Sequence, residues 1–152
     1  MPRSPAARSA SLIFGFYLGA AFQIRDDLLN LVGAEAEYGK ELLGDIREGK
    51  RTLMLIHLLR SASIDQRKSL VAFLARAGRH SDLPDDTALN IDAEAILELM
   101  VHYGSLEFAF QFGQGMATAA YESFHLAFAD VPPSASRGFI EALIPYMLAR
   151  VS

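Results

Sequence analysis

The stretch from Leu12 to Val32, LIFGFYLGAAFQIRDDLLNLV, decides the fold of this chain. Wound at about 100° per residue, it is apolar on most of its circumference, and it is followed by Gly33, a common helix terminator. A helix that is apolar on most sides needs neighbours on most sides. We therefore predict a helix from about Pro5 to Leu31 that is buried within a bundle of other helices.

Helical spacing continues through the rest of the sequence, and no stretch alternates as a strand would. A capping box of Ser63 and Gln66 marks the start of one further helix. The later helices are expected at about 48–61, 63–78, 92–104, 105–129 and 134–150, separated by a polar, glycine-punctuated segment at 33–51 and a loop at 78–90. The prediction is a single all-α domain over residues 1–152.

The composition is that of one globular domain and excludes several function classes. Of the 152 residues, 51% are hydrophobic and 21% are charged, which is enough apolar material for a substantial core. A formal net charge of −4 provides no basic surface for a nucleic acid. The absence of cysteine excludes a disulfide scaffold, a thiolate zinc site and a cysteine nucleophile, and it is compatible with a reducing cytoplasm.

The N-terminal end has the composition of a secretory signal, because Arg3 and Arg8 precede an apolar run. The helical periodicity nevertheless continues from that run into Asp26 and Asp27 without a break at a cleavage-like site. We therefore interpret the segment as a structural helix. No apolar run reaches the ~18–20 residues of a membrane span, so we predict no transmembrane segment and a cytoplasmic location.

Four polar residues share one narrow face of the first helix: Gln23, Asp26, Asp27 and Asn30. Two carboxylates and two amides, with no histidine or cysteine nearby, provide only oxygen ligands, which suit a hard cation such as Mg²⁺. The alternative is a solvated polar face on a surface helix. The spacing alone does not decide between the two.

The segment that follows the polar face is cationic. It contains Lys40 and Lys50, two of the three lysines of the chain, and glycines that allow close approach of the backbone to a ligand. A metal–diphosphate site needs this combination, because the metal neutralises one side of the anion and lysines neutralise the other. The segment therefore favours a metal–diphosphate site over a solvated face.

Residues 44–50, GDIREGK, match most of a nucleotide-binding P-loop pattern. That pattern continues with Ser or Thr, whereas this chain has Arg51, and no strand precedes the segment. We therefore exclude a P-loop NTPase.

The sequences FQIRDDLLN at 22–30 and YGKELLGDIREGKRTLML at 38–55 resemble the second aspartate-rich region of the trans-isoprenyl diphosphate synthases, or polyprenyl synthetases. The later YGSLEFAFQFGQGMATAAYESFHLAF at 103–128 is also similar to that family. Taken together, the chain resembles a geranylgeranyl diphosphate synthase. The resemblance covers nearly the whole chain from about Leu12. It implies the C-terminal part of an isoprenoid synthase-type helical bundle.

The resemblance implies a Mg²⁺-dependent prenyltransferase of isoprenoid biosynthesis, which condenses isopentenyl diphosphate with an allylic diphosphate. Asp26 and Asp27 would bind Mg²⁺, together with Asn30, which stands where many members have Asp. Lys40 and Lys50 would bind the allylic diphosphate.

Three further roles are implied by the same resemblance. Phe22 and Gln23 would face the reacting groups, and Asp45 would order the loop that carries the lysines.

The sequence departs from the family in one respect. It has no first aspartate-rich motif followed by paired arginines, and its other aspartate pair, Asp85 and Asp86, has no arginines behind it. We expect a C-terminal half that works in a dimer or other homo- or hetero-oligomer, with a chain that carries the first motif. The alternatives are a non-catalytic diphosphate-binding or regulatory subunit, or an inactive truncated chain.

The aromatic series between Phe108 and Phe128 is interpreted as core, with a prenyl tunnel as the alternative. His57 and His125 show no ligand spacing, and we interpret them as polar helix positions.

Overall fold

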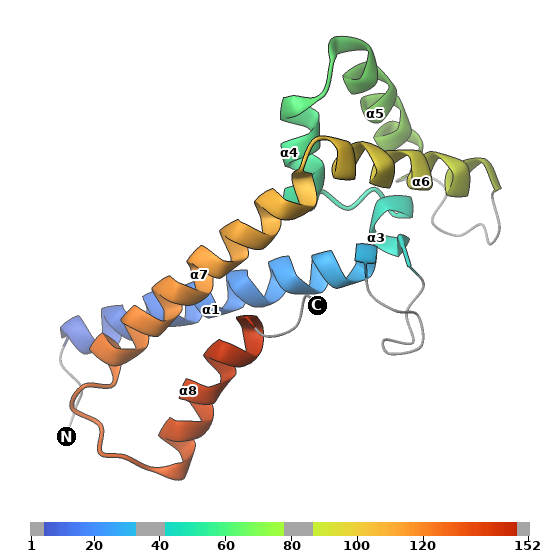
Figure 1. Ribbon diagram of the computed structural model, residues 1–152. Coiled ribbons are helices and arrows are strands. Elements are labelled where there is room, and N and C mark those ends of the chain that lie inside the picture. Colours follow the sequence, from blue (N-terminus) through green and yellow to red (C-terminus); the bar gives the residue numbers. More distant parts are fainter. Residues whose placement is uncertain (1–4, 33–41, 78–86, 149–152) are drawn as a thin grey trace. The chain divides into compact units, whose positions relative to one another are not determined.

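A computed structural model describes residues 5–32, 42–77 and 87–148, the side chains of 87–92, 147 and 148 excepted. Within these ranges every regular element is a helix, which confirms the all-α prediction (Figure 1). The helices are α1 (Pro5–Val32), α3 (Gly44–Arg47), α4 (Leu53–Ser61), α5 (Ile64–Ala77), α6 (Thr87–His102), α7 (Ser105–Ala127) and α8 (Ala135–Leu148). None of these helices is long and apolar enough to cross a membrane.

The chain divides into two compact units, and the long helices α1 and α7 contribute to both. The first unit consists of Met1–Arg25 and Phe110–Ser152, and the second of Asp26–Ala109. The single domain predicted from the sequence stays a prediction.

The core of the first unit is aromatic. Phe14 of α1 and Phe124 of α7 meet edge to face, with ring centroids 5.6 Å apart, and Ala120 and Ile144 complete the buried cluster. Phe124 is fully buried, as the core interpretation of the aromatic series requires, whereas Tyr121 is exposed. The series is therefore core on one face of α7 only.

A glycine allows α1 and α7 to approach closely within the first unit. A Cβ added at Gly113 would lie 3.3 Å from Cγ2 of Ile24, tighter than an ordinary van der Waals contact. The helix-weakening effect of a glycine inside α7 is therefore offset by closer packing.

The second unit is built around α6, which packs against α3, α4 and α5. Its core is mainly aliphatic, with Leu58 of α4 and Met100 of α6 fully buried and Phe73 of α5 as a buried aromatic. The predicted capping box is confirmed at the start of α5, where Ser63 N donates to Gln66 Oε1 at 3.1 Å and Gln66 N donates to Ser63 Oγ at 3.3 Å. Gly104, with φ of 67°, follows the end of α6 in the left-handed conformation that favours glycine.

Two helix boundaries differ from the prediction, and one short helix was not predicted. α4 begins at Leu53 rather than near residue 48, because Thr52 caps it by accepting a hydrogen bond from Leu55 N. α6 begins at Thr87 rather than at Asp92, so part of the predicted 78–90 loop is helical. The short helix α3 was expected to be part of an irregular segment.

The aromatic core provides a stability prediction for the first unit. Replacing Phe124 by Ala should lower the free energy of unfolding by about 3–5 kcal/mol, because the fully buried ring leaves a cavity. Phe139→Ala on α8 is the control, since that side chain is 67% exposed and its loss should cost only about 0.5 kcal/mol. Urea denaturation followed by circular dichroism measures both, and equal losses would contradict the described core.

Candidate functional site

The polar face of α1 includes a buried carboxylate. Asp27 is 6% exposed, and Asp26 and Asn30 are half-buried. A buried carboxylate without a partner is strongly disfavoured, because its hydration is lost. Asp27 therefore does not belong to a solvated surface face, and it requires a cation.

That cation is a lysine of the same chain. The ammonium of Lys50 donates to Asp27 Oδ1 at 2.8 Å and to Asp45 Oδ2 at 2.7 Å. Desolvation by burial would lower the pKa of Lys50, but the hydrogen bonds and charges of Asp27 and Asp45 outweigh it and raise this pKa above its ordinary value. Lys50 is therefore charged throughout the physiological pH range.

Asp45 and Lys50 are held next to each other by the short helix α3 and the turn that follows it. Asp45 lies in the first turn of α3, and Lys50 N donates to the carbonyl oxygen of Asp45 at 2.9 Å. Gly49, between them, has φ of 70°, which favours glycine at this turn. The local backbone therefore holds the Asp45 carboxylate next to the Lys50 ammonium.

Asn30 connects this turn to α1. Its side-chain oxygen accepts a hydrogen bond from Asp45 N at 3.0 Å, and its carbonyl oxygen accepts one from Leu43 N at 3.0 Å. An N–H in the first turn of a helix has no acceptor within that helix, so the amide of Asn30 caps α3 from outside. Figure 1 shows α3 beside the last turn of α1.

Asp27, Asn30, Asp45 and Lys50 form one connected network, which we call the Lys50 cradle. All four were predicted as site residues, and the structure brings them together within the second unit. Their predicted roles toward a metal or a diphosphate stay predictions. The sequence did not indicate that Lys50 pairs with Asp27, because the two are far apart along the chain.

The other predicted site residues lie elsewhere. Phe22 and Gln23 occupy exposed positions of α1, in its part that belongs to the first unit. Lys40 lies outside the described residues.

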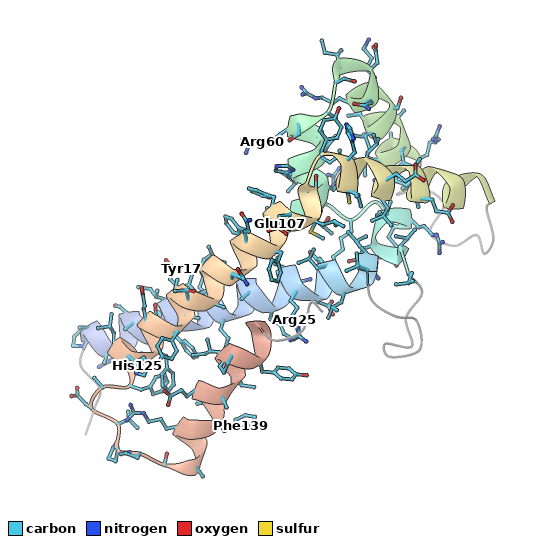
Figure 2. The ribbon with its side chains drawn as sticks, in the orientation of Figure 1. Tyr17, Arg25, Arg60, Glu107, His125 and Phe139 are labelled. Atoms are coloured by element: carbon cyan, nitrogen blue, oxygen red, sulfur yellow. The ribbon has the colours of Figure 1, made fainter. Side chains whose placement is uncertain are left out.

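Arg25 was missed by the sequence reasoning. It is 7% exposed, its Nη1 donates to the carbonyl oxygen of Tyr146 at 3.1 Å, and its guanidinium lies 5.0 Å from the centroid of the Tyr146 ring. It thereby anchors the last turns of α8 to α1 within the first unit (Figure 2). A cationic residue inside a largely apolar helical stretch was the available signal.

The donor set fits a hard cation that takes further ligands from elsewhere. Its oxygens come from carboxylates and an amide, and the Lys50 ammonium shows that a cation is accommodated between Asp27 and Asp45. Among the described residues, no three or more His, Cys, Asp or Glu residues are grouped so that they could hold a metal on their own. The arrangement suits Mg²⁺ that keeps water or phosphate oxygens as additional ligands.

Comparisons with known proteins establish the family. The polyprenyl synthetase family model matches residues 4–89, which is more than half of the 152 residues. Geranylgeranyl diphosphate synthase of Saccharolobus solfataricus is 36% identical over 110 residues, which are 72% of this chain and 30% of that protein. Octaprenyl diphosphate synthase of Escherichia coli is 34% identical over 99 residues, or 64% of this chain and 27% of that one.

Solved structures agree with this assignment. The crystal structure of geranylgeranyl pyrophosphate synthetase from Pyrococcus horikoshii has a TM-score of 0.70 and 30% identity, covering 93% of this chain and 39% of that one. Geranylgeranyl pyrophosphate synthase from Corynebacterium glutamicum, complexed with isoprenyl diphosphate and magnesium, has a TM-score of 0.72 and 29% identity, covering 97% of this chain and 38% of that one.

The fold is thus that of the all-α isoprenyl diphosphate synthases. The chain belongs to the polyprenyl synthetase family. The matched region spans 30% and 27% of the length of these two curated relatives.

Asn30 provides a test of the described network. Asn30→Leu removes the acceptor for Asp45 N–H and should lower the free energy of unfolding by about 1 kcal/mol, because one hydrogen bond is lost. Asn30→Asp keeps an acceptor oxygen and serves as the matched control. Amide hydrogen exchange followed by NMR should show faster exchange at Asp45 in the leucine variant only. Unchanged exchange at Asp45 in that variant would contradict the cap.

Proposed function

We propose that this chain provides the second aspartate-rich region of a Mg²⁺-dependent prenyltransferase that condenses isopentenyl diphosphate with an allylic diphosphate in the cytoplasm. The observation that carries the proposal is the Lys50 cradle, in which a buried carboxylate and a lysine lie together. The cradle falls within the segment that matches the family. The Corynebacterium glutamicum relative, with isoprenyl diphosphate and magnesium in its crystal structure, supports this choice of ligands.

In this proposal the carboxylates take the metal side of the site and the lysines take the anion. Asp26 and Asp27 bind Mg²⁺, with Asn30 contributing an amide oxygen. Lys50 and Lys40 bind the diphosphate as compact positive charges.

Of the three remaining predicted residues, two face the reactants and one orders the turn. Phe22 and Gln23 lie on exposed positions of α1, as contact with a substrate requires. Asp45 orders the turn that carries Lys50 through the contacts described above.

The chemistry proposed is an ionisation followed by an addition. Mg²⁺ held by these carboxylates would supply charge neutralisation of the departing diphosphate. Lys50 stabilises the same developing negative charge from the protein side. The allylic carbon–oxygen bond breaks, the double bond of isopentenyl diphosphate attacks the allylic carbon, and loss of a proton restores a double bond.

The first aspartate-rich motif with its paired arginines does not occur among the 152 residues. We propose that a partner chain in a dimer or larger oligomer supplies it. The alternative function, a non-catalytic diphosphate-binding or regulatory subunit, uses the same site without turnover.

Ligand-induced stabilisation tests the site. Thermal unfolding is measured with MgCl₂, with pyrophosphate, and with both together. Joint saturation at a hundred times the dissociation constant should add about 2.7 kcal/mol to the free energy of unfolding, because the ligands bind only the folded state. Asp26→Asn should abolish the gain, since it removes a metal ligand.

Asp65→Asn is the matched control, because Asp65 lies on α5 in a pair with Lys68 in which its side chain is 93% exposed. This variant should keep the full gain. A wild-type chain that gains nothing from both ligands together, or an Asp26 variant that gains as much as the wild type, would contradict the proposed site.

Turnover separates the two functions. Labelled isopentenyl diphosphate and an allylic diphosphate are supplied to the chain with and without a family member's segment that carries the first motif. Elongated product in the mixture only supports the prenyltransferase. Ligand binding with no product in either case supports the binding subunit.

A further inference from the structure

The Lys50 cradle contains a conflict with the roles proposed above. The Lys50 ammonium lies 2.8 Å from Asp27 Oδ1, and it donates hydrogen bonds to the carboxylates of both Asp27 and Asp45. A divalent cation on the same carboxylate would lie close to this ammonium, and the two like charges would repel each other. Metal binding at Oδ1 of Asp27 therefore requires Lys50 to leave that oxygen.

We propose that Lys50 is a stand-in cation, which occupies Asp27 until a divalent cation arrives with a diphosphate, and that Asn30 and Asp45 are the positioning residues that hold it there. The inference rests on the proposed function for the identity of the ligand. It goes beyond that function because it assigns Lys50 to Asp27 as well as to the diphosphate, and because it couples the binding of the divalent cation to the binding of the diphosphate.

The burial of Asp27 provides the reason for a stand-in. With Asp27 buried, an uncompensated carboxylate there would be strongly unfavourable in the absence of ligand. The Lys50 ammonium removes that penalty. The lysine side chain remains 39% exposed, so its flexible stem has room to carry the ammonium away.

Asp45 allows the exchange to occur by movement of the Lys50 side chain alone. The backbone N–H of Asp45 donates to the side chain of Asn30, and the Asp45 carboxylate lies 2.7 Å from the Lys50 ammonium. Because an ammonium has three donors, Lys50 can release Asp27, keep Asp45 and donate to a phosphate oxygen. The turn from Asp45 to Lys50 need not unfold during the exchange.

A coupling between ligands follows. A divalent cation alone displaces Lys50 from Asp27 and leaves the ammonium with less negative charge around it. A divalent cation with a diphosphate gives Lys50 a new anionic partner. Each ligand should therefore raise the affinity for the other, because coupling between sites is reciprocal.

Mn²⁺ binding measures the stand-in without any enzymatic turnover. The probe is Mn²⁺ alone, with the free ion followed by electron paramagnetic resonance. Lys50→Gln should bind Mn²⁺ roughly five- to tenfold more tightly than the wild type, because the competing cation is gone. Lys50→Arg keeps a cation and should bind like the wild type.

Lys68→Gln is the control for removing one positive charge. Lys68 pairs with Asp65 at 3.2 Å, with its side chain 74% exposed, so its loss should leave Mn²⁺ affinity unchanged. If Lys50→Gln is unfolded without metal, its helical circular dichroism is measured on addition of Mn²⁺. Recovery supports the stand-in, and failure to recover overturns it.

Lys50→Gln binding Mn²⁺ no more tightly than the wild type would overturn the inference. That result is distinguishable from failure of the proposed function, which is read from the joint Mg²⁺ and pyrophosphate stabilisation of the wild type. If both ligands together stabilise the wild type but Lys50→Gln binds Mn²⁺ with unchanged affinity, the metal–diphosphate site is supported and the stand-in role of Lys50 is wrong. If Lys50→Gln binds Mn²⁺ more tightly but the two ligands together do not stabilise the wild type, the exchange at Asp27 is supported and the diphosphate assignment is wrong.

Discussion

The structure of the second unit depends on compensation of one buried charge, the carboxylate of Asp27. Once that carboxylate lies at the end of α1, a cation has to reach it, and Lys50 does so at 2.8 Å. The same ammonium contacts Asp45, whose backbone is held by the amide of Asn30. Electrostatics therefore joins the turn after α3 to α1, in addition to the apolar packing of α6 against α3, α4 and α5.

The helices were largely predictable because helical periodicity is a local property. α1 and α7 carry long apolar faces, and their bounds agree with the prediction to within about two residues at each end. The start of α6 was missed because a polar cluster around Asp86 and Asp92 was interpreted as a loop and a cap. Leu89 lies four residues before Ala93 and seven before Ile96, so the helical spacing does extend back into that cluster. α3 is a single turn, too short to produce a periodic signal.

The candidate site was predictable as a set of residues but not as a set of contacts. The spacing of Asp26, Asp27 and Asn30 on one helix face is visible in the sequence, and so is the cationic segment behind it. Which cation neutralises Asp27 depends on how the chain returns to α1, and a pattern of residues contains no such information. An external metal and an internal ammonium satisfy the same electrostatic requirement, so the sequence could not distinguish them.

A site that neutralises its own charges differs in energy from one built only for its ligands. If Asp27 and Asp45 were left unpaired, their repulsion and desolvation would act against folding in the absence of metal. With Lys50 between them, both carboxylates are paired with a cation of the same unit and need no bound metal. In the proposed exchange, the free energy of that internal pair would lower the affinity for a metal alone and would be recovered when a diphosphate binds the lysine. Stability without ligand and selectivity for a metal–diphosphate pair would then both follow from the position of one ammonium.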